Sequence, residues 1–172
     1  MKKNLLFFLV FIVGSNLFSQ PVVKIFAFEQ ENMPGTKPAG ITDENGKAVK
    51  KAAAKKKYFI FLSYKQTYNV MPVQMFIKDR AFSIQSITIR KTPVEYTNKT
   101  VINNPEKTIL VPASKDKVLQ INVAEMQRQE KTPESVKRVA DKNDVVIGYV
   151  WNKRKYFATL QKIKTLEPVA NE

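Results

Sequence analysis

Apolar residues in this chain recur in short runs separated by turn residues. Residues 58–64 (YFIFLSY) are apolar or aromatic on both faces, which predicts a central strand covered on each side. From residue 117 onward, Leu119, Ile121 and Val123 alternate with polar residues, which predicts a strand with one buried face. Further strands are expected over residues 21–28, 71–77, 82–89, 93–97, 107–111, 145–151 and 156–163, the last two as a hairpin around NKRK.

Two of these strands carry irregularities. Met71, Val73, Met75 and Ile77 form one apolar stripe, and Pro72 beside them predicts an edge position or a strand start, because proline cannot donate a ladder hydrogen bond.

In the next strand Phe82 and Ile84 have one parity, whereas Ile87 and Ile89 have the other. A β-bulge near Ser86 would bring all four onto one face.

One segment has the signals of a helix. Thr132 is a suitable N-cap, Pro133 suits the first helical position and Glu134 places an acid in the first turn. Together with the strands, this short helix predicts an all-β protein: a single β-sandwich of immunoglobulin-like or related topology, with about eight strands. The domain is expected over residues 20–168, followed by a C-terminal tail over residues 169–172.

The first nineteen residues have the layout of a secretory signal peptide. Lys2 and Lys3 form a positively charged start, residues 5–13 are an unbroken apolar run, and Gly14 ends it. This run is too short to span a bilayer. We expect cleavage of residues 1–19, with cleavage after Ser15 as the alternative.

Export would place the protein in the periplasm, at the outer membrane or outside the cell. No cysteine follows the apolar run, so we expect no lipid anchor of the usual bacterial kind, and we expect no transmembrane span in the mature chain. The chain also lacks histidine, which removes Ser-His-Asp and Cys-His arrangements and most zinc and copper sites. We therefore expect a protein that is not an enzyme and has no cofactor.

The chain is strongly basic. Its formal net charge is +14, of which Lys2 and Lys3 contribute two, so the mature chain would carry about +12. Such a protein is attracted to anionic surfaces, and export removes nucleic acid as the partner. The expected partners are an anionic lipid surface, an acidic glycan or the acidic face of an envelope protein.

The first candidate site is the lysine-rich tract over residues 47–57, directly before the apolar strand. It lacks the bulky apolar stripe of an interfacial membrane helix, so one interpretation is a solvated, charged approach to a buried strand. The alternative is an anionic-partner site formed by Lys50, Lys51, Lys55, Lys56 and Lys57.

The second candidate site is WNKRKY at the expected hairpin tip. Trp151 and Tyr156 flank Lys153, Arg154 and Lys155, a combination that suits sugar rings together with phosphate or carboxylate groups. The alternative is that Trp151 faces the core, because it has the parity of the apolar positions earlier in its strand.

Two other functions remain open beside a non-enzymatic anion-binding envelope protein. One is an accessory structural subunit of an outer-membrane or periplasmic assembly. The other is a cell-wall or glycan hydrolase, which would need Glu29, Glu31 or Asp43 to face another acid across a cleft.

Several features also occur together in known small exported proteins. The FSQP end of the signal peptide, the PGTKPAG loop, the DENGK hairpin and the lysine-rich lead into YFIFLSY make the chain resemble uncharacterised exported proteins of Bacteroidota-type bacteria. This resemblance implies an envelope location and no catalytic motif.

Overall fold

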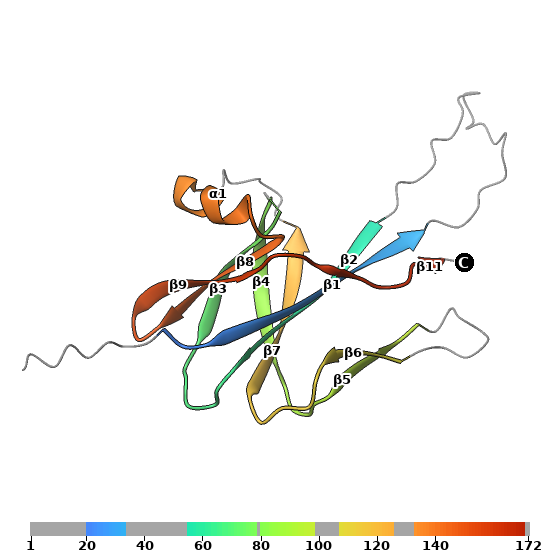
Figure 1. The fold of residues 1–172 in the computed structure, drawn as a ribbon, viewed down its shortest axis with the longest axis horizontal. Coiled ribbons are helices and arrows are strands. Elements are labelled where there is room, and N and C mark those ends of the chain that lie inside the picture. Colours follow the sequence, from blue (N-terminus) through green and yellow to red (C-terminus); the bar gives the residue numbers. More distant parts are fainter. Residues whose placement is uncertain (1–19, 34–54, 79, 99–106, 126–132, 171–172) are drawn as a thin grey trace, which may run out of the picture.

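The computed structural model describes residues 20–33, 55–78, 80–98, 107–125 and 133–170, and it is mostly β-structure (Figure 1). Its elements are β1 (Val23–Met33), β2 (Lys55–Tyr64), β3 (Met71–Ile77), β4 (Arg80–Ile89), β5 (Val94–Thr97), β6 (Lys107–Val111), β7 (Lys117–Glu125), α1 (Glu134–Ala140), β8 (Val145–Trp151), β9 (Arg154–Leu160), β10 (Lys164–Thr165) and β11 (Val169–Ala170).

Nine of these strands form one curled sheet. Its order is β10-β1-β2-β7-β4-β3-β8-β9, with β11 also paired to β1, while β5 and β6 form a separate two-stranded sheet. The prediction of an all-β fold with one short helix is confirmed. A single sandwich of immunoglobulin type is not confirmed, because the ladder runs without interruption from β10 to β9. Residues 169–170, expected in the tail, pair with the end of β1.

The sheet curls around the principal core on its concave face. The curl brings β9, at one edge, close to β1 near the other. Gln20, which precedes β1, donates to the Tyr149 hydroxyl on β8 at 3.1 Å and to the Phe157 carbonyl on β9 at 3.4 Å. The principal core consists of Ile25, Ala27, Ile60, Leu62, Tyr64, Val70, Met75, Ile77, Leu119, Ile121, Val145, Ile147, Tyr149, Trp151, Ala158 and Ile163.

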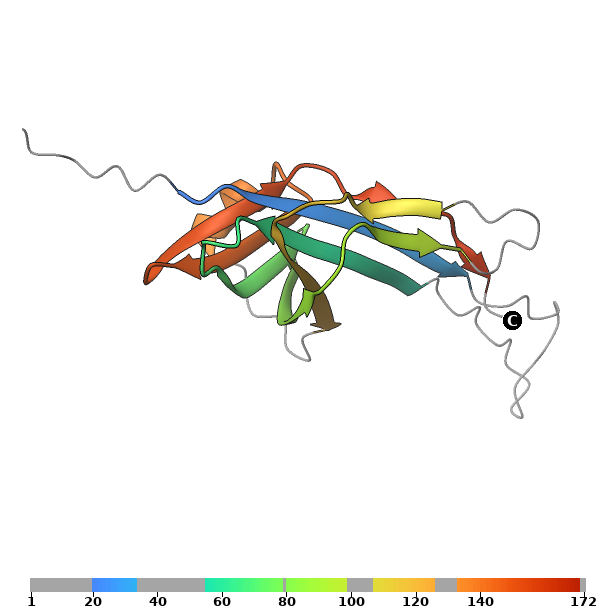
Figure 2. The same ribbon diagram turned by 90° about the horizontal axis from the view of Figure 1, so that it is seen from below.

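Two smaller clusters lie on the convex face. The β5–β6 hairpin covers part of β1, β2 and β7, where Phe28, Phe61, Leu110, Val111, Val118 and Leu166 pack together (Figure 2). Helix α1 covers β3 and β8 through Val136, which packs on Phe76 and Val146. Strand β2 is therefore covered on both faces over its apolar part, as its sequence predicts.

The expected bulge in β4 is absent. The ladder between β4 and β7 is continuous from Phe82 opposite Glu125 to Ile89 opposite Val118. Phe82 and Ile84 pack against the principal core, whereas Ile89 packs under the β5–β6 hairpin and Ile87 is exposed. The phase change in the sequence arises because both faces of β4 contact apolar neighbours, without any break in the strand.

The structure has an irregularity in β3 instead. The register between β3 and β8 shifts between Pro72 and Gln74, which turns Met71 and Val73 outward, with 57% and 46% of their surface exposed. The predicted stripe therefore holds only for Met75 and Ile77. Strand β4 pairs with residues 75–77 of β3 alone, so Pro72 lies on an open edge, as its chemistry requires.

Candidate functional site

Strands β2 and β7 are neighbours for only about half of their length. Their ladder joins residues 60–64 of β2 to residues 117–121 of β7. Beyond the ladder, residues 55–59 remain paired with β1 and residues 122–125 remain paired with β4. The two strands diverge in both views (Figure 1, Figure 2), which opens a fork in the sheet.

The fork is hollowed into a groove with a volume of about 1100 Å³, which we call the basic groove. Five of its lining side chains are basic, and most of the others are apolar or aromatic. The lining residues are Asn32, Lys55, Lys56, Lys57, Tyr58, Phe59, Ile77, Lys78, Arg80, Phe82, Gln120, Asn122 and Val123.

Lys56 is the basic residue of the groove that has acidic partners. Its Nζ lies 3.2 Å from Glu29 Oε2 and 3.8 Å from Glu31 Oε1, both on the adjacent strand β1. The hydrogen bond to Glu29 and the charge of that carboxylate raise the pKa of Lys56. These contacts stabilise the lysine-rich part of β2, because opposite charges in cross-strand positions are favourable.

The other cations of the groove are available to a ligand. Within the described part of the chain, no carboxylate lies at ion-pair distance from Lys55, Lys57, Lys78 or Arg80. Lys57 extends over the Phe59 ring, with Nζ 5.0 Å from the ring centroid. Asp79, which lies between two of these residues in the sequence, is outside the described residues.

Tyr58 lies on the inner wall of the basic groove. Burial raises the pKa of its hydroxyl, and Glu29 adds to this effect, whereas Lys56 and Arg80 oppose it. The phenol is therefore neutral at physiological pH, and it offers a hydrogen-bond donor beside the cations.

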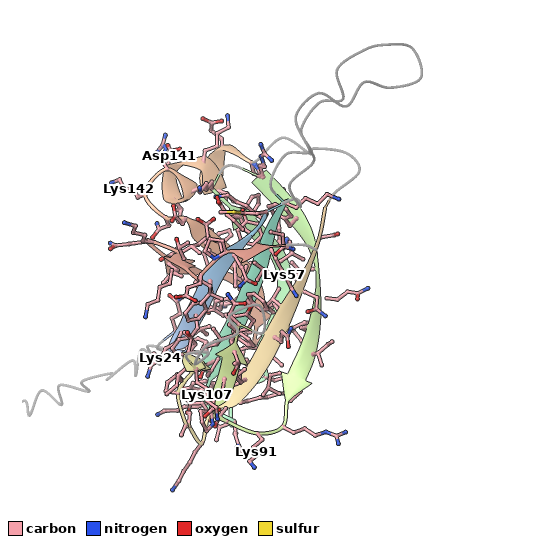
Figure 3. The ribbon with its side chains drawn as sticks, turned by 90° about the vertical axis from the view of Figure 1, so that its right-hand side faces the viewer. Lys24, Lys57, Lys91, Lys107, Asp141 and Lys142 are labelled. Atoms are coloured by element: carbon pink, nitrogen blue, oxygen red, sulfur yellow. The ribbon has the colours of Figure 1, made fainter. Side chains whose placement is uncertain are left out.

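The structure separates the two basic groups that the sequence predicts. Lys55, Lys56 and Lys57 lie at the start of β2, in the groove, and Lys50 and Lys51 lie outside the described residues. The β8–β9 tip lies near the far end of β2, about 30 Å away for a strand of this length. Figure 3 shows Lys57 beside β2 and near β7.

At the β8–β9 tip, Trp151 belongs to the core. It is only 9% exposed, and its ring packs edge-on against Tyr68, with centroids 5.8 Å apart. Tyr156 is half-buried and packs beside it at 6.0 Å. The core-facing interpretation of Trp151 is confirmed, and no aromatic platform from this pair stands beside the exposed Lys153, Arg154 and Lys155.

Sequence reasoning missed Lys78 and Arg80. They lie at the turn between β3 and β4. Because β4 pairs with β7, this turn lies beside the basic groove. The only local signal was the charged turn KDR between two apolar strands. Which other residues it would meet depends on strand order, which no local pattern reveals.

The carboxylates proposed for a hydrolase do not form a facing pair in the described structure. Glu29 and Glu31 lie on the same strand and both contact Lys56, and Asp43 is outside the described residues. Among the described residues there is no cluster of three or more acidic, histidine or cysteine side chains suited to a metal ion. No helix in the described ranges has the length and hydrophobicity needed to cross a membrane.

Comparisons of the chain with protein-family models, with curated proteins and with solved structures give no match.

Proposed function

We propose that this protein is a non-enzymatic, exported envelope protein that binds an anionic partner in the basic groove. The observation that carries the proposal is the convergence of Lys55, Lys57, Lys78 and Arg80 from two separate hairpins around one hollow. Cations within a concave, partly apolar site create a focused positive potential, because low-dielectric walls concentrate the field. In the basic groove, a concentration of positive charge coincides with a hollow surface.

Export and net charge support the same proposal. The signal-peptide layout of residues 1–19 would place the protein in the periplasm, at the outer membrane or outside the cell, where anionic lipids, glycans and protein surfaces are available. Lys153, Arg154 and Lys155 form a second basic group at the other end of the sheet, and none of them lines the basic groove. We assign it a minor, non-specific contribution.

A second candidate function is that of an accessory subunit in an envelope assembly. The observation in its favour is the exposure of Met71, Val73 and Phe157 on β3 and β9, on either side of β8, with Phe157 40% exposed. Exposed apolar residues on neighbouring strands are typical of protein contact surfaces. Copurification that survives high salt would support this function over electrostatic binding.

We also propose that the curled sheet is an open sandwich. Strands β10, β1, β2, β7 and β4 would form one half, and β3, β8 and β9 the other, with the principal core between them. The short ladder between β3 and β4, limited to residues 75–77 and 80–82, supports this division.

Binding to fluorescent heparin and to vesicles containing phosphatidylglycerol tests the function. The triple variant Lys55→Gln, Lys57→Gln, Arg80→Gln should weaken binding by about 100-fold, because each cation near an anionic surface contributes about 1 kcal/mol. The matched control is Lys153→Gln, Arg154→Gln, Lys155→Gln, which removes the same charge at the other end of the sheet and should have a smaller effect.

Affinity should also fall steeply as salt rises from 50 to 300 mM, because screening weakens exposed charge interactions. Equal losses in the two triple variants would contradict a specific role for the groove. Binding that is independent of ionic strength would contradict the electrostatic mechanism itself.

A further inference from the structure

The basic groove has a second property besides its charge: both of its long sides are strand edges. Residues 55–59 of β2 pair with β1 on one side, and residues 122–125 of β7 pair with β4 on one side. Within the described residues, neither stretch has a strand partner on the side that faces the groove. Such edges present backbone N–H and C=O groups that can pair with an added chain.

The dimensions of the fork suit a short extended segment. Five residues of β2 present an edge about 16 Å long, the length of an ordinary strand of five residues. The groove volume of about 1100 Å³ is larger than most small-molecule pockets require. A peptide strand would continue the β2 ladder where β7 departs from it.

The side chains around the fork specify the chemistry of this segment. Alternation along β2 places Lys55 and Lys57 on the convex face with Phe59, opposite to the core-facing parity of Tyr58. An added strand would therefore meet two cations, spaced two residues apart, on one of its faces. Acidic residues at alternate positions would lie across from them, and opposite charges in cross-strand positions are favourable.

The other face of the added strand would meet a mainly apolar wall. Ile77, Phe82 and Val123 line the groove on the core side, and the first is fully buried while the others pack against the principal core. Apolar residues alternating with the acids would contact this wall and the Tyr58 ring. Arg80 lies at its margin and could bind a further carboxylate.

We propose that the partner in the basic groove is an extended acidic segment of another protein, with alternating acidic and apolar residues, which adds to the open edge of β2 as a strand. This inference rests on the proposed function and makes it more specific. Backbone pairing would supply affinity, as in other cases of strand addition, while Lys55 and Lys57 would select acidic side chains.

The test uses a fluorescent peptide of the sequence Glu-Val-Glu-Val-Glu-Val-Glu with blocked ends, measured by anisotropy at low salt. Two further peptides carry N-methyl groups on every second amide, one on the glutamates and the other on the valines, so that each loses the donors of one strand edge while the charge is kept. We expect at least one methylated peptide to bind about tenfold more weakly than the parent, because several hydrogen bonds are lost. A peptide of the same composition in blocks, Glu-Glu-Glu-Glu-Val-Val-Val, should also bind more weakly.

The double variant Lys55→Gln, Lys57→Gln should lose affinity for the parent peptide. The matched double variant Lys153→Gln, Lys155→Gln should retain it. Equal binding of all four peptides would overturn strand addition and leave anion binding intact. Heparin or vesicle binding in the groove without any peptide binding would overturn this inference alone. Absence of peptide, heparin and vesicle binding would overturn both proposals.

Discussion

The turn between β8 and β9 contains a residue whose side chain and backbone conformation conflict. Asn152 and Lys153 both have positive φ, at 47° and 63°, between the paired residues Trp151 and Arg154. A two-residue hairpin turn of this kind favours asparagine followed by glycine, because a Cβ makes positive φ unfavourable. Asn152 fits this preference and Lys153 does not.

We therefore predict that Lys153→Gly increases the free energy of unfolding by about 0.5–1 kcal/mol relative to Lys153→Ala, because glycine relieves the strain but loses more chain entropy on folding. The alanine variant is the matched control, since it removes the same charge and keeps the Cβ. Urea denaturation followed by circular dichroism measures the difference. Equal stability of the two variants would show that the turn is not strained.

At the scale of elements, the β5–β6 hairpin is held on the sheet by a buried polar contact as well as by apolar packing. Gln30 on β1 is 2% exposed, and its Nε2 donates to the Tyr96 hydroxyl at 2.7 Å and to the Glu167 carbonyl at 2.8 Å. The Tyr96 hydroxyl in turn donates to Gln30 Oε1 at 3.0 Å. The contact joins β5, β1 and the segment between β10 and β11.

Tyr96→Phe should destabilise the protein by about 1–3 kcal/mol, because it deprives a buried amide of a partner. Adding Gln30→Leu to this variant should recover part of the loss, since the buried amide is then removed, and only part because the Glu167 carbonyl loses its donor. Thermal and urea unfolding of the two single variants and the double variant measure the coupling. Simple additivity of the two single effects would contradict a direct interaction.

The sequence predicts most of these elements because their signals are local. Alternating residues such as Leu119 and Ile121, and turn residues between the runs, identify the strands and the terminal hairpin. The pairing of Lys55–Lys57 with β1 could not be predicted in this way, because it depends on a partner strand distant in the sequence, where Glu29 and Glu31 contact Lys56. The bulge assigned to β4 was wrong for a related reason, since the cover on its second face comes from a distant hairpin.

At the scale of the whole molecule, the candidate site depends on strand order. The sequence singles out Lys55, Lys56 and Lys57 by their density of charge, but it contains no sign that Lys78 and Arg80 lie across a groove from them. That proximity arises because β4 pairs with β7, and β7 departs from β2 halfway. Non-local pairing of this kind brings together residues that periodicity treats as unrelated.

Buried tyrosines make the stability of the whole molecule depend on alkaline pH. Burial is the main cause that raises the pKa values of Tyr58, Tyr64 and Tyr149. Tyrosines of the unfolded chain lose their protons near pH 10, whereas these three keep them in the folded state. Above that pH the unfolded state binds fewer protons, so the contribution to stability is complete below pH 10 and is lost as pH rises through the folded pKa values.

We predict that Tyr58→Phe reduces the loss of unfolding free energy between pH 9 and pH 11, because it removes one of the three tyrosines whose pKa is raised by burial. The substitution breaks no hydrogen bond between the Tyr58 hydroxyl and another described residue. Lys56 interacts with Tyr58, and each affects the pKa of the other, so the comparison is made with Lys56→Gln present in both the parent and the variant. Tyr64→Phe is a useful contrast, because Tyr64 donates to the Val70 carbonyl at 3.2 Å and its loss should lower stability at pH 7 as well. Urea titrations at each pH, with tyrosinate absorbance at 295 nm, measure both quantities. Identical pH profiles for Tyr58→Phe and the parent would mean that Tyr58 ionises alike in the folded and unfolded chains, and that the cations beside it in the groove offset the effect of burial.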